Sequence, residues 1–137
     1  MKDTFVLNFD TMPKGTSQEK GVNHRTGKFY SNNRCQAAEW LFRSKLKQHR
    51  PPEPSLKPIK LYVWLTFDVT DKSLWGKYKP TRPDTDNYIK LFKDCMTKEK
   101  FWRDDSQVVD ERIIKTYAEK ATIFVRWSEL GDKPNEE

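Results

Sequence analysis

The chain contains few cysteines, histidines and glycines, and it has no long apolar run. No stretch approaches the roughly 20 apolar residues that a membrane span needs, and residues 1–5 lack the apolar region of a secretory signal. Cys35 and Cys95 lie far apart without a Cys-x-x-Cys pair, which favours two reduced core thiols over a disulfide. We therefore expect a cytoplasmic protein that has no membrane partner.

Two common kinds of catalytic site are excluded in the same way. His24 and His49 have no Cys or His neighbour at zinc-ligand spacing, and no Gly-x-Ser-x-Gly is present for a serine hydrolase. Residues 21–28 (GVNHRTGK) look like a phosphate-binding loop but have one residue too many. Phe29 also stands where the hydroxyl ligand of Mg²⁺ belongs. A nucleotide site of this kind is therefore rejected.

The length of the chain limits the number of domains, and its charge limits the kind of partner. With 137 residues it is expected to form a single domain, which we place at residues 1–130, with residues 131–137 as a disordered tail. The 26 Lys and Arg against 20 Asp and Glu give a formal charge of +6. Such a basic balance favours a polyanionic partner, either nucleic acid or anionic lipid.

Hydrophobic periodicity predicts alternating strands and helices. Strands are expected at 4–10, 59–69, 107–117 and 121–127, and helices at 35–49 and 86–97. The basic, glycine-containing segment 11–34 is expected to be a loop with a small hairpin around Phe29 and Tyr30. The resulting β-α-β-α-β-β order predicts an α+β domain in which two main helices pack on a small mixed β-sheet.

Four acidic residues mark the part of the chain that carries chemistry. Asp84 and Asp86 stand at the start of the second predicted helix, and Asp104 and Asp105 lie in the loop after it. If this loop packs against the start of the helix, three or four carboxylates crowd together and repel each other unless a cation binds among them. Oxygen ligands without His or Cys fit Mg²⁺, or Mn²⁺ in its place.

Each acid also has a purely structural interpretation, which the sequence leaves open. Asp84 or Asp86 would serve as an ordinary helix N-cap, and Asp86 would form a surface ion pair with Lys90 one turn later. Asp104 and Asp105 are also typical turn residues.

Basic residues surround these acids, so that an acidic pocket would lie in a basic field suited to binding phosphates. We expect DNA contacts from the following cations of the loops and of the second helix: Lys14, Arg25, Lys77, Lys79, Arg82 and Lys93.

Two short motifs carry a family resemblance. Asp84-Thr85-Asp86-Asn87 with Lys90, followed by FWRDDSQVVD at 101–110, resembles the RusA family of Holliday-junction resolvases. The resemblance is close from Arg82 to Lys115 and loose over the N-terminal half. It implies a small homodimeric, Mg²⁺-dependent endonuclease that nicks opposing strands of four-way DNA junctions, on bacterial chromosomal or phage DNA.

Carried over by position, the resemblance implies a role for each acid. Asp84, Asp86 and Asp105 would be catalytic, metal-binding carboxylates, and Lys90 the essential lysine. Asp104 would either shape the loop or hold the metal-binding residues in position without binding the metal itself. Tyr88 replaces an aliphatic residue often seen in the family, but it lies on the apolar arc of the helix.

Two other functions fit part of the pattern. One is a general flap or single-strand nuclease, or a nucleotidyl-transfer enzyme, which would use the same metal carboxylates without a preference for junctions. The other is a non-catalytic basic DNA-binding module whose acids only cap a helix and turn a loop. Trp75, Phe101 and Trp102 are candidates either for the dimer interface or for the core.

Overall fold

The alternating segment at 59–69 forms strand β4 (Ile59–Asp68) in a computed structural model that describes residues 1–14, 20–22, 29–31 and 33–134. β4 is an inner strand of a four-stranded sheet of order β1-β6-β4-β5. The other strands are β1 (Lys2–Phe9), β5 (Val108–Ala118) and β6 (Ala121–Glu129). β6 pairs antiparallel with β1 and β4, whereas β5 pairs parallel with β4. The prediction of a mixed sheet is therefore confirmed.

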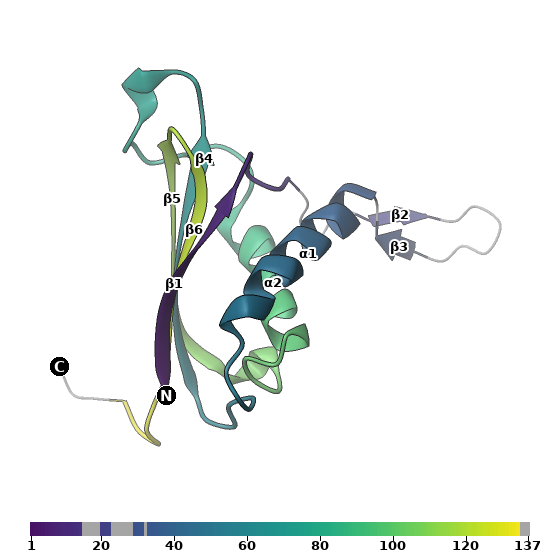
Figure 1. Ribbon diagram of the computed structural model, residues 1–137, viewed down its shortest axis with the longest axis vertical. Coiled ribbons are helices and arrows are strands. Elements are labelled where there is room, and N and C mark those ends of the chain that lie inside the picture. The colour runs from purple at the N-terminus through teal and green to yellow at the C-terminus, as the bar shows by residue number, and fades with distance from the viewer. Residues whose placement is uncertain (15–19, 23–28, 32, 135–137) are drawn as a thin grey trace.

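Both main helices lie on one side of this sheet (Figure 1). They are α1 (Asn33–Leu46), which continues into the short 3-10 helix η1 (Lys47–His49), and α2 (Thr85–Lys98). The expected hairpin is present as β2 (Lys20–Val22) and β3 (Phe29–Ser31), which pair antiparallel. Two further 3-10 turns are η2 (Lys72–Leu74) and η3 (Asp105–Gln107). The α+β class is confirmed, with the hairpin adding two short strands to the predicted order.

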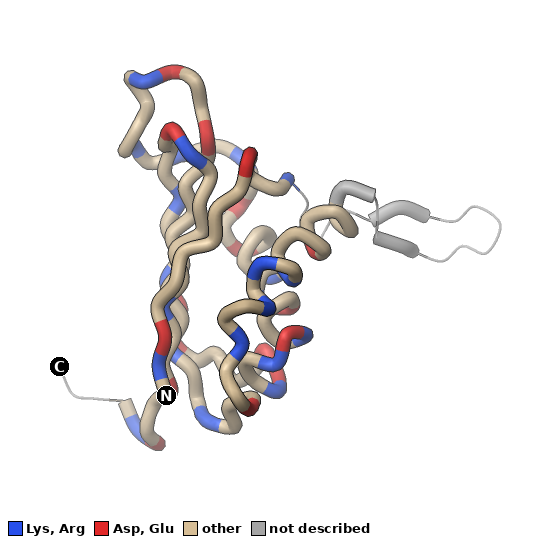
Figure 2. The backbone as a smooth tube through the Cα atoms, in the orientation of Figure 1, with Lys and Arg blue, Asp and Glu red and all other residues tan. Residues whose placement is uncertain are grey.

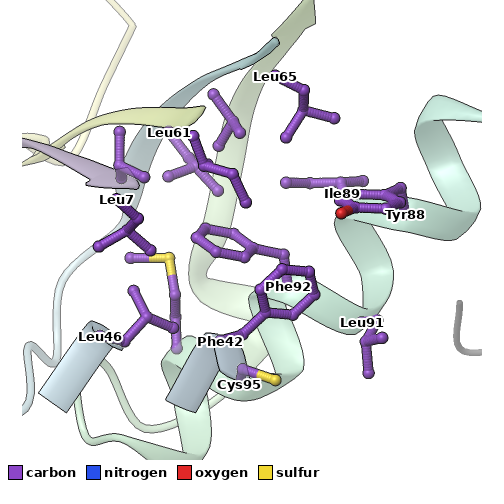
Figure 3. Packing of buried hydrophobic residues seen from close by; sticks show 14 of the residues in the cluster. Leu7, Phe42, Leu46, Leu61, Leu65, Tyr88, Ile89, Leu91, Phe92 and Cys95 are labelled. Atoms are coloured by element: carbon purple, nitrogen blue, oxygen red, sulfur yellow. The ribbon is translucent and has the colours of Figure 1, made fainter. Parts of the chain in front are cut away.

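The core fills the space between the sheet and the two helices (Figure 3). The apolar arc predicted for the second helix is confirmed, because all its members are buried: Tyr88, Ile89, Leu91, Phe92, Cys95 and Met96. Phe42 of α1 packs edge-on against Tyr88 and Phe92. Burial of each large apolar side chain stabilises the fold by about 1.5–3 kcal/mol, so this arc fixes which side of α2 faces outward.

Phe101 and Trp102 belong to the core rather than to a surface. Both are almost completely inaccessible to solvent, and both pack edge-on against Trp127 of β6. Their interpretation as interface residues is therefore wrong. Cys35 and Cys95 are free and buried, as expected.

A buried carboxylate ties α1 to the end of α2. Glu99 accepts hydrogen bonds from Arg43 at 2.7 Å and from Arg50 at 2.6 Å. Burial alone would raise the pKa of Glu99, but the two guanidinium groups outweigh it and hold this pKa below its usual value. Since the pKa is lowered in the folded state, this contribution to stability is present at neutral pH and is lost as the pH falls.

In the part of the chain that the structure describes, no helix combines the length and hydropathy that a bilayer crossing requires. Lys and Arg occur together with Asp and Glu along both helices and in the loop above the sheet (Figure 2). Residues 131–134 follow β6 and are exposed, whereas the rest of the predicted tail lies outside the described residues.

Candidate active site at the start of helix α2

The first turn of α2 presents two carboxylates and an ammonium group to solvent. Asp84 occupies the N-cap position with an extended backbone, but its side chain makes no capping hydrogen bond. Asp86 in the first turn and Lys90 one turn later are exposed. Among the described residues, no hydrogen bond or salt bridge engages any of these three side chains. Neither the side-chain cap nor the Asp86–Lys90 ion pair is formed, so the three charges are available to a ligand.

The loop that precedes Asp84 is fastened to the end of β5. The backbone N–H of Lys79 donates to the carbonyl of Lys115, and the N–H of Tyr117 donates to the carbonyl of Lys77. The Lys115 ammonium donates to the carbonyls of Thr81 at 2.7 Å and Pro83 at 2.6 Å. The Arg82–Pro83 peptide bond is cis. Lys115 thus anchors the residues immediately before Asp84.

Lys115 also lies in an electrostatically unusual place for a lysine. Burial lowers its pKa, and the nearby charge of Lys79 lowers it further, while Asp84 acts in the opposite direction. The sequence offered no signal for this role, because the side of β5 that carries Lys115 also carries the charged Glu111 and is therefore not an apolar stripe. We interpret Lys115 as a positioning residue for Asp84.

A pocket of about 740 Å³ opens where β4 and β5 end and α2 begins. In sheets with parallel strands, ligands bind at the carboxyl ends of the strands, and the start of a helix there favours anions. Two carboxylates, one amide and three cations line this pocket: Asp68, Asp84, Asn87, Lys14, Lys79 and Arg82. This arrangement can hold a phosphate group beside the Asp84 carboxylate.

One of the three cations is held over aromatic rings. The Lys79 ammonium lies 5.4 Å from the centroid of Phe67 and 5.3 Å from that of Tyr117, and it donates to the Thr81 hydroxyl. Cation–π contacts of this kind restrict the side chain without neutralising its charge. Lys79 is therefore oriented toward the pocket in advance of any ligand.

Asp68 and Tyr88 fasten the segment that carries Lys14. The Asp68 carboxylate accepts hydrogen bonds from the Thr11 hydroxyl and the Met12 N–H, both at 2.9 Å. The buried Tyr88 hydroxyl donates to the carbonyl of Pro13 at 2.7 Å. Sequence reasoning missed both roles, because each contact joins residues more than fifty positions apart. It also gave no role to Asn87.

Asp68 accepts these hydrogen bonds as an ionised carboxylate. Burial would raise the pKa of its carboxyl, but the hydrogen bonds from Met12 and Thr11 and the charge of Lys14 outweigh burial and lower the pKa. Asp68 is therefore ionised at neutral pH. Its stabilising contribution is lost only as the pH falls through the lowered value.

For the DNA cleavage that the family resemblance implies, Asp68→Ala is expected to raise the KM for DNA about three- to tenfold while kcat changes little, because it removes two hydrogen bonds, each worth about 0.5–1.5 kcal/mol. Tyr88→Phe should act in the same direction, since it frees the Pro13 carbonyl but keeps the ring. Steady-state cleavage kinetics measure both parameters. Asp71→Ala is the matched control, because Asp71 only caps η2. Equal KM values for Asp68→Ala and Asp71→Ala would contradict this role.

The two acids after α2 have different positions. Asp104 caps η3: its side chain accepts from the Ser106 N–H, and the Gln107 side chain accepts from the Asp104 N–H. Hydrogen bonds from the backbone and the side chain of Ser106 lower the pKa of the Asp104 carboxyl. Asp105 is half-buried and accepts from the Thr97 hydroxyl, which in turn accepts from the Trp102 indole at 2.8 Å. Asp104 therefore shapes the loop, as one of the two expected roles proposed.

The structure does not bring Asp105 to the other two acids within one chain. Its partner Thr97 is at the C-terminal end of α2, eleven residues after Asp86, which is roughly 16 Å along a helix that rises 1.5 Å per residue. Within the described residues, no group of three or more Asp, Glu, His or Cys is placed to hold a metal ion. Asp84 and Asp86 lie at one end of the helix and Asp105 at the other.

The predicted DNA-binding cations lie in different surroundings. Lys14, Lys79 and Arg82 line the pocket beside Asp84, and Lys77 is exposed on the same loop as Lys79. Lys93, by contrast, forms a 2.8 Å salt bridge with Glu111 of β5 and is largely covered. Arg25 lies outside the described residues.

Comparison with known proteins identifies the family to which the chain is similar. The sequence model described as "Endodeoxyribonuclease RusA" matches residues 10–127. A crossover junction endodeoxyribonuclease rusA of Lactococcus phage r1t is 33% identical over 132 residues, covering 95% of this chain and all of the phage protein. An uncharacterized protein, YqaN of Bacillus subtilis (strain 168), is 34% identical over 95 residues, covering 61% of this chain and 66% of its own. The match thus extends well beyond the two motifs, and the chain belongs to the RusA family of endodeoxyribonucleases.

Proposed function

We propose that this protein is a structure-selective DNA endonuclease that resolves four-way junctions by Mg²⁺-dependent hydrolysis of phosphodiester bonds. The observation that carries the proposal is the set of unpaired charges on Asp84, Asp86 and Lys90 beside a cation-lined pocket. The family and the name of the phage relative support the same activity.

The donor atoms at the start of α2 suit a hard divalent cation. Asp84 and Asp86 offer carboxylate oxygens, the ligands that Mg²⁺ and Mn²⁺ prefer, and no cap or ion pair from the described residues uses these oxygens. A bound ion would lower the pKa of a water molecule and neutralise charge on the phosphate. Lys90 would donate to a phosphate oxygen as charge develops. Lys14, Lys79 and Arg82 would hold neighbouring phosphates, with the positive end of the α2 dipole adding to the attraction.

The separation of Asp105 from the other acids supports a homodimer. A single chain offers two free carboxylates at one end of α2 and a third at the other end. In an isologous dimer the two chains contact each other reciprocally, so Asp105 of each chain would complete the Asp84–Asp86 pair of its partner. Two equivalent sites in one particle would also match the two equivalent cuts that a four-way junction requires.

The outer edge of β5 is suited to such a contact. Loop residues pair with β5 only near Lys115, Thr116 and Tyr117 among the described residues, and Val109 on its first half is 63% exposed. Two β5 edges paired antiparallel about Glu111 would set Asp110 opposite the partner's Arg112. This pairing would direct Asp105 toward the end of the partner strand at which Lys115 holds the Asp84 loop.

Mixing two inactive variants is expected to restore cutting if the sites are shared between chains. Asp86→Asn and Asp105→Asn should each be inactive alone. A mixed dimer would contain one site with both defects and one site with neither. It should therefore nick one strand of the junction instead of two opposing strands. Refolding or co-expressing the two variants and assaying a labelled junction tests this. A mixture as inactive as its components, with mixed dimers demonstrated by mass spectrometry, would contradict the shared site.

A comparison of substrates tests the proposed function against its two rivals. With Mg²⁺ present, cleavage of a four-way junction should exceed cleavage of linear, flap and single-stranded DNA of the same sequence. Equal cleavage of flaps or single strands would favour the general nuclease. Salt-dependent binding without cleavage in Mg²⁺ or Mn²⁺ would favour the binding module.

A further inference from the structure

The side of the sheet opposite the two helices is uncovered in the described part of the chain (Figure 1). The strand register sets outward side chains in rows across this side. One row is Val6, Phe124, Trp64 and Ile114, the next is Thr4, Arg126, Tyr62 and Arg112, and the third is Lys2, Ser128, Lys60 and Asp110. We call these three rows the aromatic face.

The first row exposes a large apolar surface. Trp64 is 41% exposed and Val6 45% exposed, and both line a hollow of about 440 Å³ together with Phe124. Phe124 packs edge-on against Tyr62 with ring centroids 6.0 Å apart. Adjacent exposed apolar side chains of this size mark a binding surface more often than scattered single ones do.

Cations flank the rings of the aromatic face. The guanidinium groups of Arg112 and Arg126 each lie 5.8 Å from the centroid of Tyr62, and Arg126 lies 5.5 Å from that of Phe124. Lys2 and Lys60 stand in the next row, where Asp110 is the one carboxylate of the twelve positions. The face is therefore both aromatic and basic.

We propose that the aromatic face binds unpaired nucleotides of single-stranded DNA. Cations attract the phosphates, and exposed rings stack on bases whose faces are free, which is how single-strand-binding surfaces are built. In a duplex the bases already stack on each other. A second copy of the chain fits less well, because four cations and one carboxylate would meet the same excess of positive charge. This site lies away from Asp84 and needs no metal, so it goes beyond the proposed endonuclease activity.

Binding of a fluorescein-labelled oligothymidylate to the full chain in EDTA, followed by fluorescence anisotropy, tests the proposal. Trp64→Ala and Arg126→Glu are each expected to weaken binding about tenfold, the effect of losing one stacked base or its flanking cation. Trp40→Ala is the matched control, because Trp40 is 69% exposed on α1. It should leave the affinity unchanged.

Trp64 also donates a 2.9 Å hydrogen bond to the Thr116 hydroxyl, so circular dichroism must show that its variant folds. If Trp64→Ala does not fold, Arg126→Glu still tests the proposal, since Arg126 is exposed at the surface. The proposal is overturned if the wild type does not bind the oligonucleotide, or if folded variants bind as tightly as Trp40→Ala. It is also overturned if sedimentation shows that Arg126→Glu converts a dimer to a monomer, which would make this face an interface between copies. Loss of junction cleavage in Mg²⁺ would leave the EDTA result intact, so the two proposals fail separately.

Discussion

Asp86→Asn is expected to abolish cleavage of four-way junctions while the protein still folds and binds DNA. The substitution keeps the shape of the side chain but removes the charge that would hold the metal ion. Loss of one group that stabilises a developing charge costs about 10²–10³ in kcat, and we expect at least this effect. Asp86 is exposed and makes no described hydrogen bond or ion pair. The free energy of unfolding should therefore change by less than about 1 kcal/mol, which is what a carboxylate near a helix N-terminus contributes.

Gel-based cleavage and fluorescence anisotropy on the same labelled junction separate catalysis from binding in this variant. Asp94→Asn is a suitable control, because Asp94 lies on the same helix and, among the described residues, forms a salt bridge only with Lys98 at 3.2 Å. The control should cut as the wild type does. Cleavage by Asp86→Asn at the rate of the control would remove Asp86 from the active site.

Lys90→Ala is expected to lower kcat on the order of a hundredfold or more, with a smaller effect on the Kd for DNA. A lysine that donates to a phosphate oxygen in the transition state acts chiefly on the chemical step. As an ion-pair partner of Asp86, by contrast, Lys90 would contribute only about 0.3–0.5 kcal/mol to stability, and that pair is not formed among the described residues. Single-turnover cleavage with saturating protein measures the chemical step directly.

Lys98→Ala serves as the control for Lys90, since Lys98 pairs with Glu39 at 2.7 Å and joins the two helices. It should lower the melting temperature slightly without a change in the cleavage rate. If Lys90→Ala affected only the melting temperature, its role would be structural.

Much of the fold follows from local periodicity. β4 alternates buried residues with exposed or half-buried ones along its whole length, and α2 separates its apolar arc completely from its polar one, so both were predictable to within about two residues. The end of α1 was less predictable, because residues 47–49 form a 3-10 turn before Pro51 instead of continuing the α-helix. Sequence periodicity does not distinguish that turn from a continued helix.

The candidate site was only partly predictable, because it is assembled from distant segments. The motif identified Asp84, Asp86 and Lys90, which are local to one helix. It did not reveal that Asp105 lies at the opposite end of that helix, a position set by the length of α2 and by the Thr97 contact. The contacts of Asp68 and Lys115 depend on how β4 and β5 end beside each other, which only the tertiary fold determines.

The most direct test of the account is strand-resolved cleavage of a four-way junction, with each of the four strands labelled in turn. In Mg²⁺, the wild type should produce symmetric, paired nicks in two opposing strands, and EDTA or Asp86→Asn should abolish them. A linear duplex of the same sequence should remain uncut. Tight binding of the junction without nicks in either Mg²⁺ or Mn²⁺ would contradict the proposed metal-dependent resolvase.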